Sequence, residues 1–211
     1  MLISELFESA EQLDTLVILP GRFQPWHKGH KAVYDSLAQK YGRDRVFIAT
    51  SNKVELPKSP FSFGDKTQFM ALTGVPLDRV VETSQPYRAI EIVSKYNPAS
   101  TILIFAISEK DMAEDPRFSS FVKKDGLPTY FQPMPRDPSM MAALDKHAYI
   151  LTVPTVNFTV LGQPMKSATE IRALFIQSPP EIQKQLVQDL FGAYNDEVYN
   201  IMQQKLKLSA A

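Results

Sequence analysis

Residues 15–42, TLVILPGRFQPWHKGHKAVYDSLAQKYG, carry in immediate succession the signals of a strand, a loop and a helix. The apolar run at 15–19 is typical of a strand that is buried in a parallel sheet. After the loop, apolar residues recur at helical spacing up to a glycine that can end the helix: Ala32, Val33, Leu37, Tyr41 and Gly42. The loop itself, residues 20–30, holds two of the three histidines of the chain. A strand that leads through a loop into a helix indicates the start of an α/β fold.

Strands and helices continue to alternate along the chain. Apolar runs predict further strands, and helical patterns predict helices between them: strands at 45–50, 79–83, 101–107 and 148–154, helices at 64–73, 88–96 and 167–177. This alternation predicts an α/β fold with a doubly wound, mostly parallel sheet and helices on both faces. In such folds ligands bind at the carboxyl ends of the strands. The loop with the two histidines follows such an end.

Three segments lie outside this alternation. Residues 1–14 have apolar residues at helical spacing and predict a short docking helix, with a partner-binding peptide as the alternative. Residues 111–140 contain five prolines without clear periodicity and read as an irregular insertion, either a lid or a surface excursion. Residues 179–211 have a helical pattern whose apolar stripe indicates core packing or contact with a second copy of the chain. We therefore expect one main domain at 15–178 between an N-terminal helix and C-terminal helices.

The composition excludes several classes of site. The chain has no cysteine, which excludes disulfides, thiolate zinc sites and a cysteine nucleophile. Lys plus Arg and Asp plus Glu both number 23, so we do not expect extended nucleic acid as a partner, although a small anion needs only a local positive pocket. The N-terminus has acids where a signal peptide has bases, and no apolar run is long enough to span a membrane. We expect a cytoplasmic protein that does not bind membranes.

His27 and His30 stand three residues apart across the predicted start of a helix, so their rings can project to the same side. Gly29 leaves room for a ligand to approach the backbone, and a helix N-terminus offers unpaired N–H groups and partial positive charge. The pair therefore favours a phosphate site, at which imidazoles stabilise the charge that develops during phosphoryl transfer. A zinc site would need more ligands than His147 and carboxylates, and a structural histidine pair is the other alternative. No Gly-x-Ser-x-Gly elbow and no glycine-lysine phosphate loop occurs in the chain.

Two stretches resemble a known family. GRFQPWHKGH (21–30) resembles the His-x-Gly-His signature of the nucleotidylyltransferase superfamily, in the form of the archaeal-type nicotinamide-nucleotide adenylyltransferases. SATEIR (167–172) resembles the second signature, Ser-x-Thr-x-x-Arg, which opens a helix late in the domain. Between them, SPFSFGDKTQFM (59–70) is similar to a Pro-Phe-x-x-x-Glu-Arg segment, with Asp65 and Lys66 in place of Glu-Arg. The resemblance spans about residues 15–177 and implies a Rossmann-like fold.

The resemblance also implies the reaction and the site. The enzyme would transfer a nucleoside monophosphate from a triphosphate, preferably ATP, to a phosphorylated small molecule, preferably nicotinamide mononucleotide, and release pyrophosphate. His30 would contact the α-phosphate and the transition state, with His27 beside it on the triphosphate. The remaining phosphate contacts would come from both signatures and from the segment between them: Gly21, Arg22, Phe23, Gly29, Lys66, Ser167, Thr169 and Arg172. A magnesium ion would bridge the phosphates with few protein ligands, and no metal-ligating residue is assigned.

Three further residues are expected near the acceptor or the base. Ser108 and Asp111 lie where related enzymes have a glycine-containing loop after a strand, but the family glycine is absent here. Trp26 stands where the closest family form has phenylalanine; it either packs in the core or stacks on an acceptor ring. Other functions stay open: cytidylyl transfer to a phospho-alcohol, adenylyl transfer to phosphopantetheine, or a catalytically silent nucleotide sensor.

Overall fold

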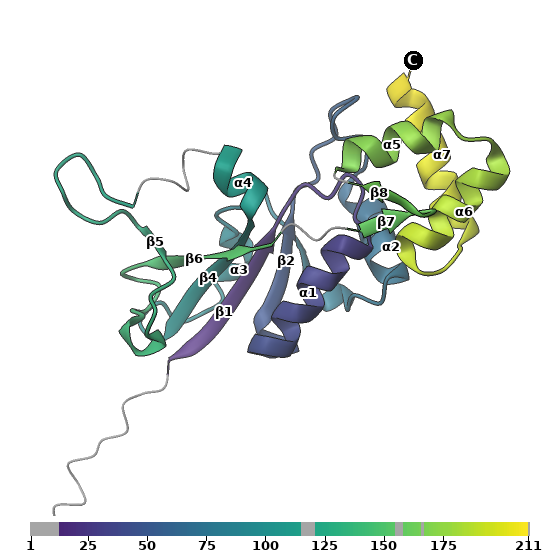
Figure 1. The fold of residues 1–211 in the computed structure, drawn as a ribbon. Helices are drawn as coiled ribbons and strands as arrows, with labels where there is room; N and C mark the ends of the chain where they lie inside the picture. The colour runs from purple at the N-terminus through teal and green to yellow at the C-terminus, as the bar shows by residue number, and fades with distance from the viewer. Residues whose placement is uncertain (1–12, 115–120, 155–157, 166, 211) are drawn as a thin grey trace, which may run out of the picture.

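The computed structural model describes residues 13–114, 121–154, 158–165 and 167–210. Six strands form one sheet in the order β3-β2-β1-β4-β6-β5, and every neighbouring pair is parallel (Figure 1). The strands are β1 (Asp14–Pro20), β2 (Val46–Thr50), β3 (Val80–Glu82), β4 (Thr101–Ser108), β5 (Phe131–Pro133) and β6 (Ala148–Val153). The predicted parallel α/β sheet is confirmed.

Helices connect these strands and extend the domain beyond the last of them. They are α1 (Lys28–Tyr41), α2 (Phe63–Leu72), α3 (Ile90–Val93), α4 (Glu109–Glu114), α5 (Ala168–Gln177), α6 (Pro180–Phe191) and α7 (Asp196–Ala210). An antiparallel hairpin, β7 (Phe158–Val160) and β8 (Gln163–Met165), lies between β6 and α5 in the sequence. In Figure 1, α5, α6 and α7 lie on the same side as α1 and α2, and α3 lies on the other. Helices therefore cover both faces of the sheet, as predicted.

Alternate side chains of the strands pack into two separate core layers, because successive side chains of a strand point to opposite faces of the sheet. Val17 and Leu19 of β1 belong to the larger layer, beneath the helices α1, α2, α5, α6 and α7. Leu16 and Ile18 belong to the smaller layer, which α3 covers with Ile92. Both layers are fully closed to solvent at their centres, so β1 is buried on both faces, as its continuous apolar run predicted.

The order of the strands reverses at β1. The chain runs outward from β1 through β2 to β3, and then returns to the other side of β1 to form β4. Loops that follow β1 and β4 consequently diverge and leave a crevice at the carboxyl ends of these strands. This crevice is where the loop with the two histidines begins.

The chain differs from the sequence-based expectation in three places. The helix expected at 88–96 is a single turn, α3, which begins after a left-handed residue, Ala89 (φ 45°). The segment 111–140 is not wholly irregular, because it contributes the end of α4 and the edge strand β5. The hairpin β7–β8 had no recognisable signal, since its strands have only three residues each. The helix expected at 1–14 lies, up to residue 12, outside the described residues.

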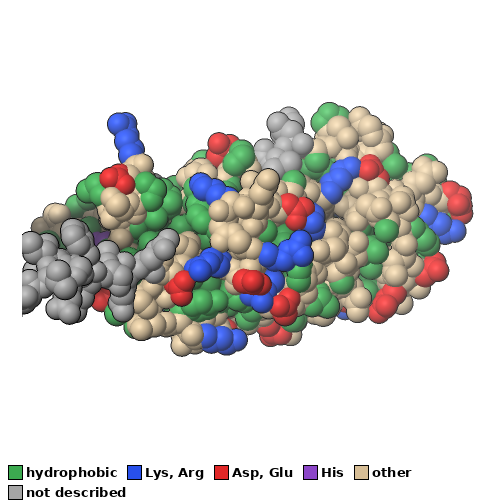
Figure 2. Space-filling model, turned by 90° about the horizontal axis from the view of Figure 1, so that it is seen from below, with side chains coloured by type: hydrophobic (Ala, Val, Ile, Leu, Met, Phe, Trp, Pro, Cys, Tyr) green, Lys and Arg blue, Asp and Glu red, His purple; other side chains and the backbone are tan. Residues whose placement is uncertain are grey.

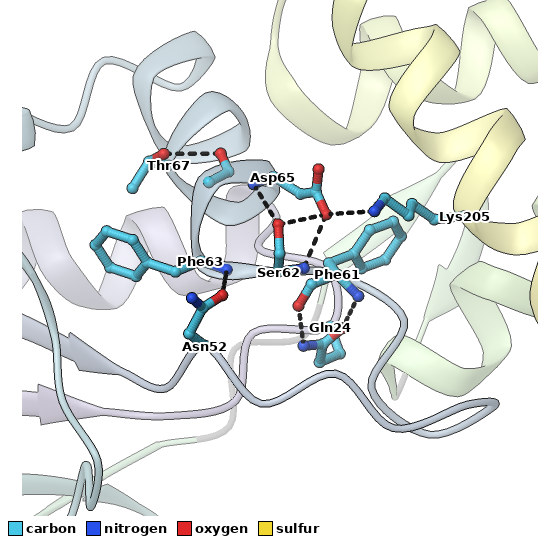
Figure 3. A network of polar contacts seen from close by, with 9 residues as sticks. Gln24, Asn52, Phe61, Ser62, Phe63, Asp65, Thr67 and Lys205 are labelled. Atoms are coloured by element: carbon cyan, nitrogen blue, oxygen red, sulfur yellow. Dashed lines mark hydrogen bonds and ion pairs between the residues drawn. The ribbon is translucent and has the colours of Figure 1, made fainter.

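The C-terminal helices are part of the domain core. Leu186 and Leu190 of α6 and Val198 and Met202 of α7 are buried in the larger core layer, so the predicted apolar stripe is a core surface here. A polar network also joins α7 to the start of α2 (Figure 3): Asp65 and Ser62 form a reciprocal cap there, and Lys205 of α7 lies 3.5 Å from the Asp65 carboxylate. Among the described residues, no helix is both long and apolar enough to cross a membrane.

Candidate active site

A cavity of about 590 Å³ lies at the carboxyl ends of β1, β4 and β6. Its walls come from the loop after β1, the first turn of α1, the start of α4, Phe158 of β7 and the first turn of α5. The two sequence signatures, about 140 residues apart in the chain, thus face each other across one cavity. The predicted residues that line it are Gly21, Arg22, Phe23, His27, Gly29, His30, Ser108, Asp111, Ser167, Thr169 and Arg172. Lys66 and Trp26 are not among the lining residues.

The two histidines are stacked face to face. Their ring centroids are 3.7 Å apart with an interplanar angle of 25°, and the ring of Phe158 stacks on the other face of His27 at 4.4 Å. His27 is the residue that precedes α1, and His30 lies in the first turn of that helix. Backbone N–H groups of a first helical turn have no acceptor within the helix. The cavity wall therefore combines imidazole rings with the positive end of α1.

Both histidines are neutral in the free protein at neutral pH. Burial lowers the pKa of His30 to about 3, and burial, followed by the nearby His30 and Lys28, lowers the pKa of His27 well below its usual range. The Nδ1 atoms of both rings are buried and have no hydrogen-bond partner in the described part of the chain. Unpaired buried nitrogen atoms carry a free-energy cost. A satisfied structural pair would avoid this cost, so the two rings are not held in place by Nδ1 hydrogen bonds to the described residues.

The lowered histidine pKa values predict an acid-sensitive fold. Below about pH 6.5 the unfolded chain binds protons at His27 and His30, whereas in the folded chain the lowered pKa values keep both rings neutral. The free energy of unfolding therefore falls as the pH falls. The slope can reach about 1.4 kcal/mol per pH unit for each histidine. Urea unfolding at several pH values between 6.5 and 5 measures this slope. These pH values lie above the range in which carboxylates titrate. The double variant His27→Gln, His30→Gln should have a flatter profile, and an equal slope would contradict the prediction.

At two glycines the surrounding rings crowd the position of a Cβ. A Cβ on Gly21 would lie 2.6 Å from the ring of Phe23, which folds back over it because Phe23 itself has a left-handed backbone (φ 48°). A Cβ on Gly29 would lie 3.0 Å from both His27 Nδ1 and the Phe158 ring. The space that Gly29 leaves open is therefore occupied partly by the His27–Phe158 stack, and not only by the ligand approach that the sequence suggested.

Arg172 reaches the cavity from α5 and holds the opposite loop. Ser167 caps α5 by accepting a hydrogen bond from the Glu170 N–H at 3.2 Å, which places Thr169 and Arg172 in its first turns. The guanidinium donates to the Gln24 carbonyl at 2.6 Å and to Thr169 Oγ1 at 3.3 Å. Burial and the nearby charge of Arg22 lower the pKa of Arg172. Two cations brought this close together favour an anion between them.

The charge around the cavity is positive, although the whole chain is neutral. Lys58 and Lys110 line the cavity together with Arg22 and Arg172, and Asp111 is the one acidic side chain among the described lining residues. Tyr87 and Phe158 line the cavity as well, and none of Lys58, Lys110, Tyr87 and Phe158 was predicted from the sequence, because each comes from a loop or short element without a motif. On the face shown in Figure 2, basic and acidic side chains are interspersed, without a continuous basic surface.

Lys66, predicted to contact phosphate, lies elsewhere. It is completely buried, and its ammonium group donates to Thr50 Oγ1 at 2.9 Å and to the Ser51 carbonyl. Burial lowers its pKa to about 8. Lys66 therefore fixes the chain at the end of β2 and does not reach the cavity. The sequence could not show this, because the residue type at a motif position does not tell whether the side chain points into the site or lies beneath it.

Of the three residues expected near the acceptor or the base, Trp26 is excluded from the cavity. It is fully buried, its Nε1 donates to Thr73 Oγ1 at 2.9 Å, and its ring packs against Phe23 and His30. The core alternative is thus the correct one. Ser108 and Asp111 do line the cavity, but Ser108 Oγ accepts a hydrogen bond from the Asp111 N–H at 3.0 Å, as a turn at the start of α4.

Solved structures support the same fold. The chain is similar to a bifunctional NMN adenylyltransferase/ADP ribose pyrophosphatase from Francisella tularensis complexed with AMP and a manganese ion, with 18% identity and a TM-score of 0.52. The aligned region covers 94% of this chain and 52% of the Francisella chain. The nicotinic acid mononucleotide adenylyltransferase of Plasmodium falciparum, complexed with NaAD, is 11% identical with a TM-score of 0.51, over 90% of this chain and 95% of that one. At such identities the likeness shows the fold.

Sequence comparisons identify the family. Nicotinamide-nucleotide adenylyltransferase 1 of Sulfolobus acidocaldarius is 31% identical over 96 residues, which are 41% of this chain and 55% of the relative. The chain thus matches about half the length of that relative and of the Francisella protein. A family model described as cytidylyltransferase-like matches residues 18–173, a range that begins in β1 and ends in α5 and so includes both signatures. The resemblance drawn from the two signatures is confirmed: the chain belongs to the cytidylyltransferase-like family.

Proposed function

We propose that this protein transfers the adenylyl group of ATP to nicotinamide mononucleotide and releases pyrophosphate. The observation that carries the proposal is the meeting of His27 and His30 with Arg172 in one positively charged cavity at the switch point of the sheet. The choice of ATP and of this acceptor is supported by the names of the Sulfolobus relative and the Francisella structure. The same cavity would serve other members of the reaction class, so the substrates need a direct test.

In the proposed reaction the protein needs only to align the two substrates and to stabilise the charge on the phosphate oxygens. An anionic phosphate oxygen of the acceptor attacks the α-phosphorus, a new P–O bond forms, and the bond to the β-phosphate oxygen breaks to release pyrophosphate. The attacking oxygen is already ionised at neutral pH, so neither a general base nor an enzyme nucleophile is needed. Holding both substrates in line and stabilising the charge on the oxygens can supply most of the acceleration.

We assign the phosphate contacts by their place in the cavity. His30, in the first turn of α1, donates a hydrogen bond to the α-phosphate as charge builds there, and His27 donates to the neighbouring phosphate. A neutral imidazole has one N–H to donate, and the phosphate charge favours its protonated form. Across the cavity Arg172, with Ser167 and Thr169, holds the β- and γ-phosphates.

The loop after β1 completes the phosphate site in this assignment. Arg22 adds a second positive charge, and the backbone of Gly21 and Phe23 forms the floor. Lys58 and Lys110, which the sequence did not suggest, line the same cavity and add to its positive charge. Four cations against one carboxylate match a ligand with several phosphate charges better than a neutral one.

Magnesium is the metal that we propose to accompany the triphosphate. Within the described residues, no group of three His, Asp or Glu side chains could hold a metal ion, and Asp111 is the acidic residue of the cavity. Mg²⁺ typically binds through one or two carboxylates and the substrate phosphates, so this donor set fits an ion carried in with ATP. When bound, such an ion neutralises part of the triphosphate charge.

The test is a pyrophosphate-release screen with Mg²⁺, in which ATP and CTP are each paired with several acceptors. ATP with nicotinamide mononucleotide should give the highest turnover, with loss of signal when either substrate is omitted. Activity only with CTP and glycerol 3-phosphate, or only with ATP and phosphopantetheine, would replace the substrates and keep the reaction class. Binding of ATP by calorimetry without turnover on any acceptor would reject the enzyme in favour of a nucleotide sensor.

A further inference from the structure

The hairpin β7–β8 reaches the histidine pair through one side chain. Phe158, the first residue of β7, stacks on His27 at 4.4 Å, and His27 stacks on His30 at 3.7 Å, so three rings form one column. The two outer rings of this column, Phe158 and His30, come from elements about 130 residues apart in the sequence. Phe158 also lines the cavity.

The column is what orients the His27 ring. His27 is 7% exposed, its Nδ1 has no hydrogen-bond partner among the described residues, and its side chain does not cap α1. A histidine that binds a ligand is usually held by a hydrogen bond from its other ring nitrogen. His27 Nδ1 makes no such bond to the described residues. Stacking against the faces of Phe158 and His30 therefore orients the His27 ring.

The hairpin is tied to the residue beside His27. One carboxylate, Asp189 of α6, accepts a hydrogen bond from the Leu161 N–H at the hairpin turn and another from Lys28 Nζ, each at 2.6 Å. Lys28 directly follows His27. Asp189 therefore links the turn of the hairpin to the first residue of α1, next to His27.

Phe158 differs from the residues that anchor the hairpin in the core. Val160 and Met165, one from each strand of the hairpin, are 0% and 8% exposed and belong to the larger core layer. Phe158 is only partly buried at the edge of that layer and faces the cavity. Folding of the hairpin can therefore rest on Val160 and Met165, while the aromatic ring at 158 serves the histidines.

We propose that Phe158 is a positioning residue, which holds His27 against His30 so that both imidazoles are aimed at the phosphates before substrate arrives. The inference rests on the proposed function for its kinetic consequence, but not for its structural one. Without an aromatic ring at 158, His27 gains room to turn away from its partner and water gains access to the ring. Misplacement of a catalytic group by about 1 Å can cost about 10²-fold in rate.

The matched variants are Phe158→Leu, which keeps an apolar side chain and removes the ring, and Phe158→Tyr, which keeps the ring. In the free protein, NMR follows the ring protons of His27 and His30, assigned with the single variants His27→Gln and His30→Gln. Phe158→Leu should move the His27 resonances away from their ring-current-shifted positions and raise its pKa towards the usual value, because burial is lost. Phe158→Tyr should retain both. The charged groups beside the pair, Lys28, Arg22 and Arg172, are the same in every protein compared.

The kinetic arm measures pyrophosphate release by the same variants. Phe158→Leu should lower kcat about 10-fold or more with a smaller change in KM for the triphosphate, and Phe158→Tyr should restore it. Unchanged His27 resonances and pKa in a folded Phe158→Leu protein would overturn the inference, whatever the activity. Equal loss of kcat in both variants would also overturn it, since the ring would then not be what matters. A wild-type protein without turnover would reject the proposed function alone, because the NMR arm needs no substrate.

Discussion

Replacing His30 with alanine should reduce kcat by about 10²–10³ while ATP binding changes little. His30 lies in the first turn of α1, against the cavity, in the place assigned to the α-phosphate. Charge on that phosphate group increases only as the transition state forms, so an interaction with it contributes more to turnover than to ground-state binding. Loss of one such pre-aimed donor typically costs about 10²–10³ in rate. Steady-state pyrophosphate release and calorimetric ATP binding, measured side by side, separate the two effects.

The third histidine of the chain supplies the control. His147 does not line the cavity and lies in the turn before β6, so His147→Ala should leave kcat near that of the wild type. Circular dichroism establishes that each variant is folded. A folded His30→Ala protein with near-normal turnover would show that the stacked pair is structural, and the assignment of His30 to the reacting phosphate would be wrong.

Arg172→Ala should weaken ATP binding and turnover together. The guanidinium lies across the cavity from the histidines, in the place assigned to phosphates that are already charged in the ground state. A hydrogen bond to a charged group contributes about 1.5–3 kcal/mol, which corresponds to a roughly 10- to 150-fold rise in the dissociation constant for ATP. The KM for ATP should rise as well. Calorimetry and initial rates over a wide range of ATP concentration give both numbers.

Arg172→Lys separates charge from geometry. Lysine keeps the positive charge but cannot present two parallel N–H donors, so its dissociation constant for ATP should lie between those of the wild type and Arg172→Ala. Arg172 also donates to the Gln24 carbonyl, so part of the loss in both variants would come from the loop after β1. If ATP binds Arg172→Ala as tightly as the wild type, Arg172 serves only that loop and does not touch the phosphates.

The sequence predicted most of what depends on local pattern. Buried parallel strands read as unbroken apolar runs, so β1, β2, β4 and β6 lie where they were expected. The cap of α5 and the end of α1 were also visible, because Ser167 and Gly42 have the chemistry of helix termini. The histidine pair was found by residue type and spacing, and the topology of a parallel sheet was enough to expect it at a carboxyl edge. The second signature was recognised by its resemblance to the family, which implied that both signatures contact the same phosphates.

The parts that were missed depend on contacts between distant residues. Nothing local marks Phe158, whose role comes from a ring about 130 positions earlier in the chain. Lys66 was placed in the site because of the motif around it, and Trp26 was expected either in the core or against an acceptor ring. Whether such a side chain points into a cavity or lies beneath it depends on packing. The edge strand β5 has only three residues in a proline-rich segment, too few for a period of two to be recognised.

The burial of Trp26 has a practical consequence, because it is the one tryptophan of the chain. Its ring centroid lies 5.0 Å from that of Phe23 and 5.4 Å from that of His30, and Trp26 belongs to the loop after β1, which lines the cavity. Intrinsic fluorescence excited at the red edge of the absorption band therefore comes from a single indole beside the site. Protonated imidazole quenches indole emission more strongly than neutral imidazole does. The protein thus contains its own optical reporter, with which the arrival of a nucleotide beside His30 can be followed without a label.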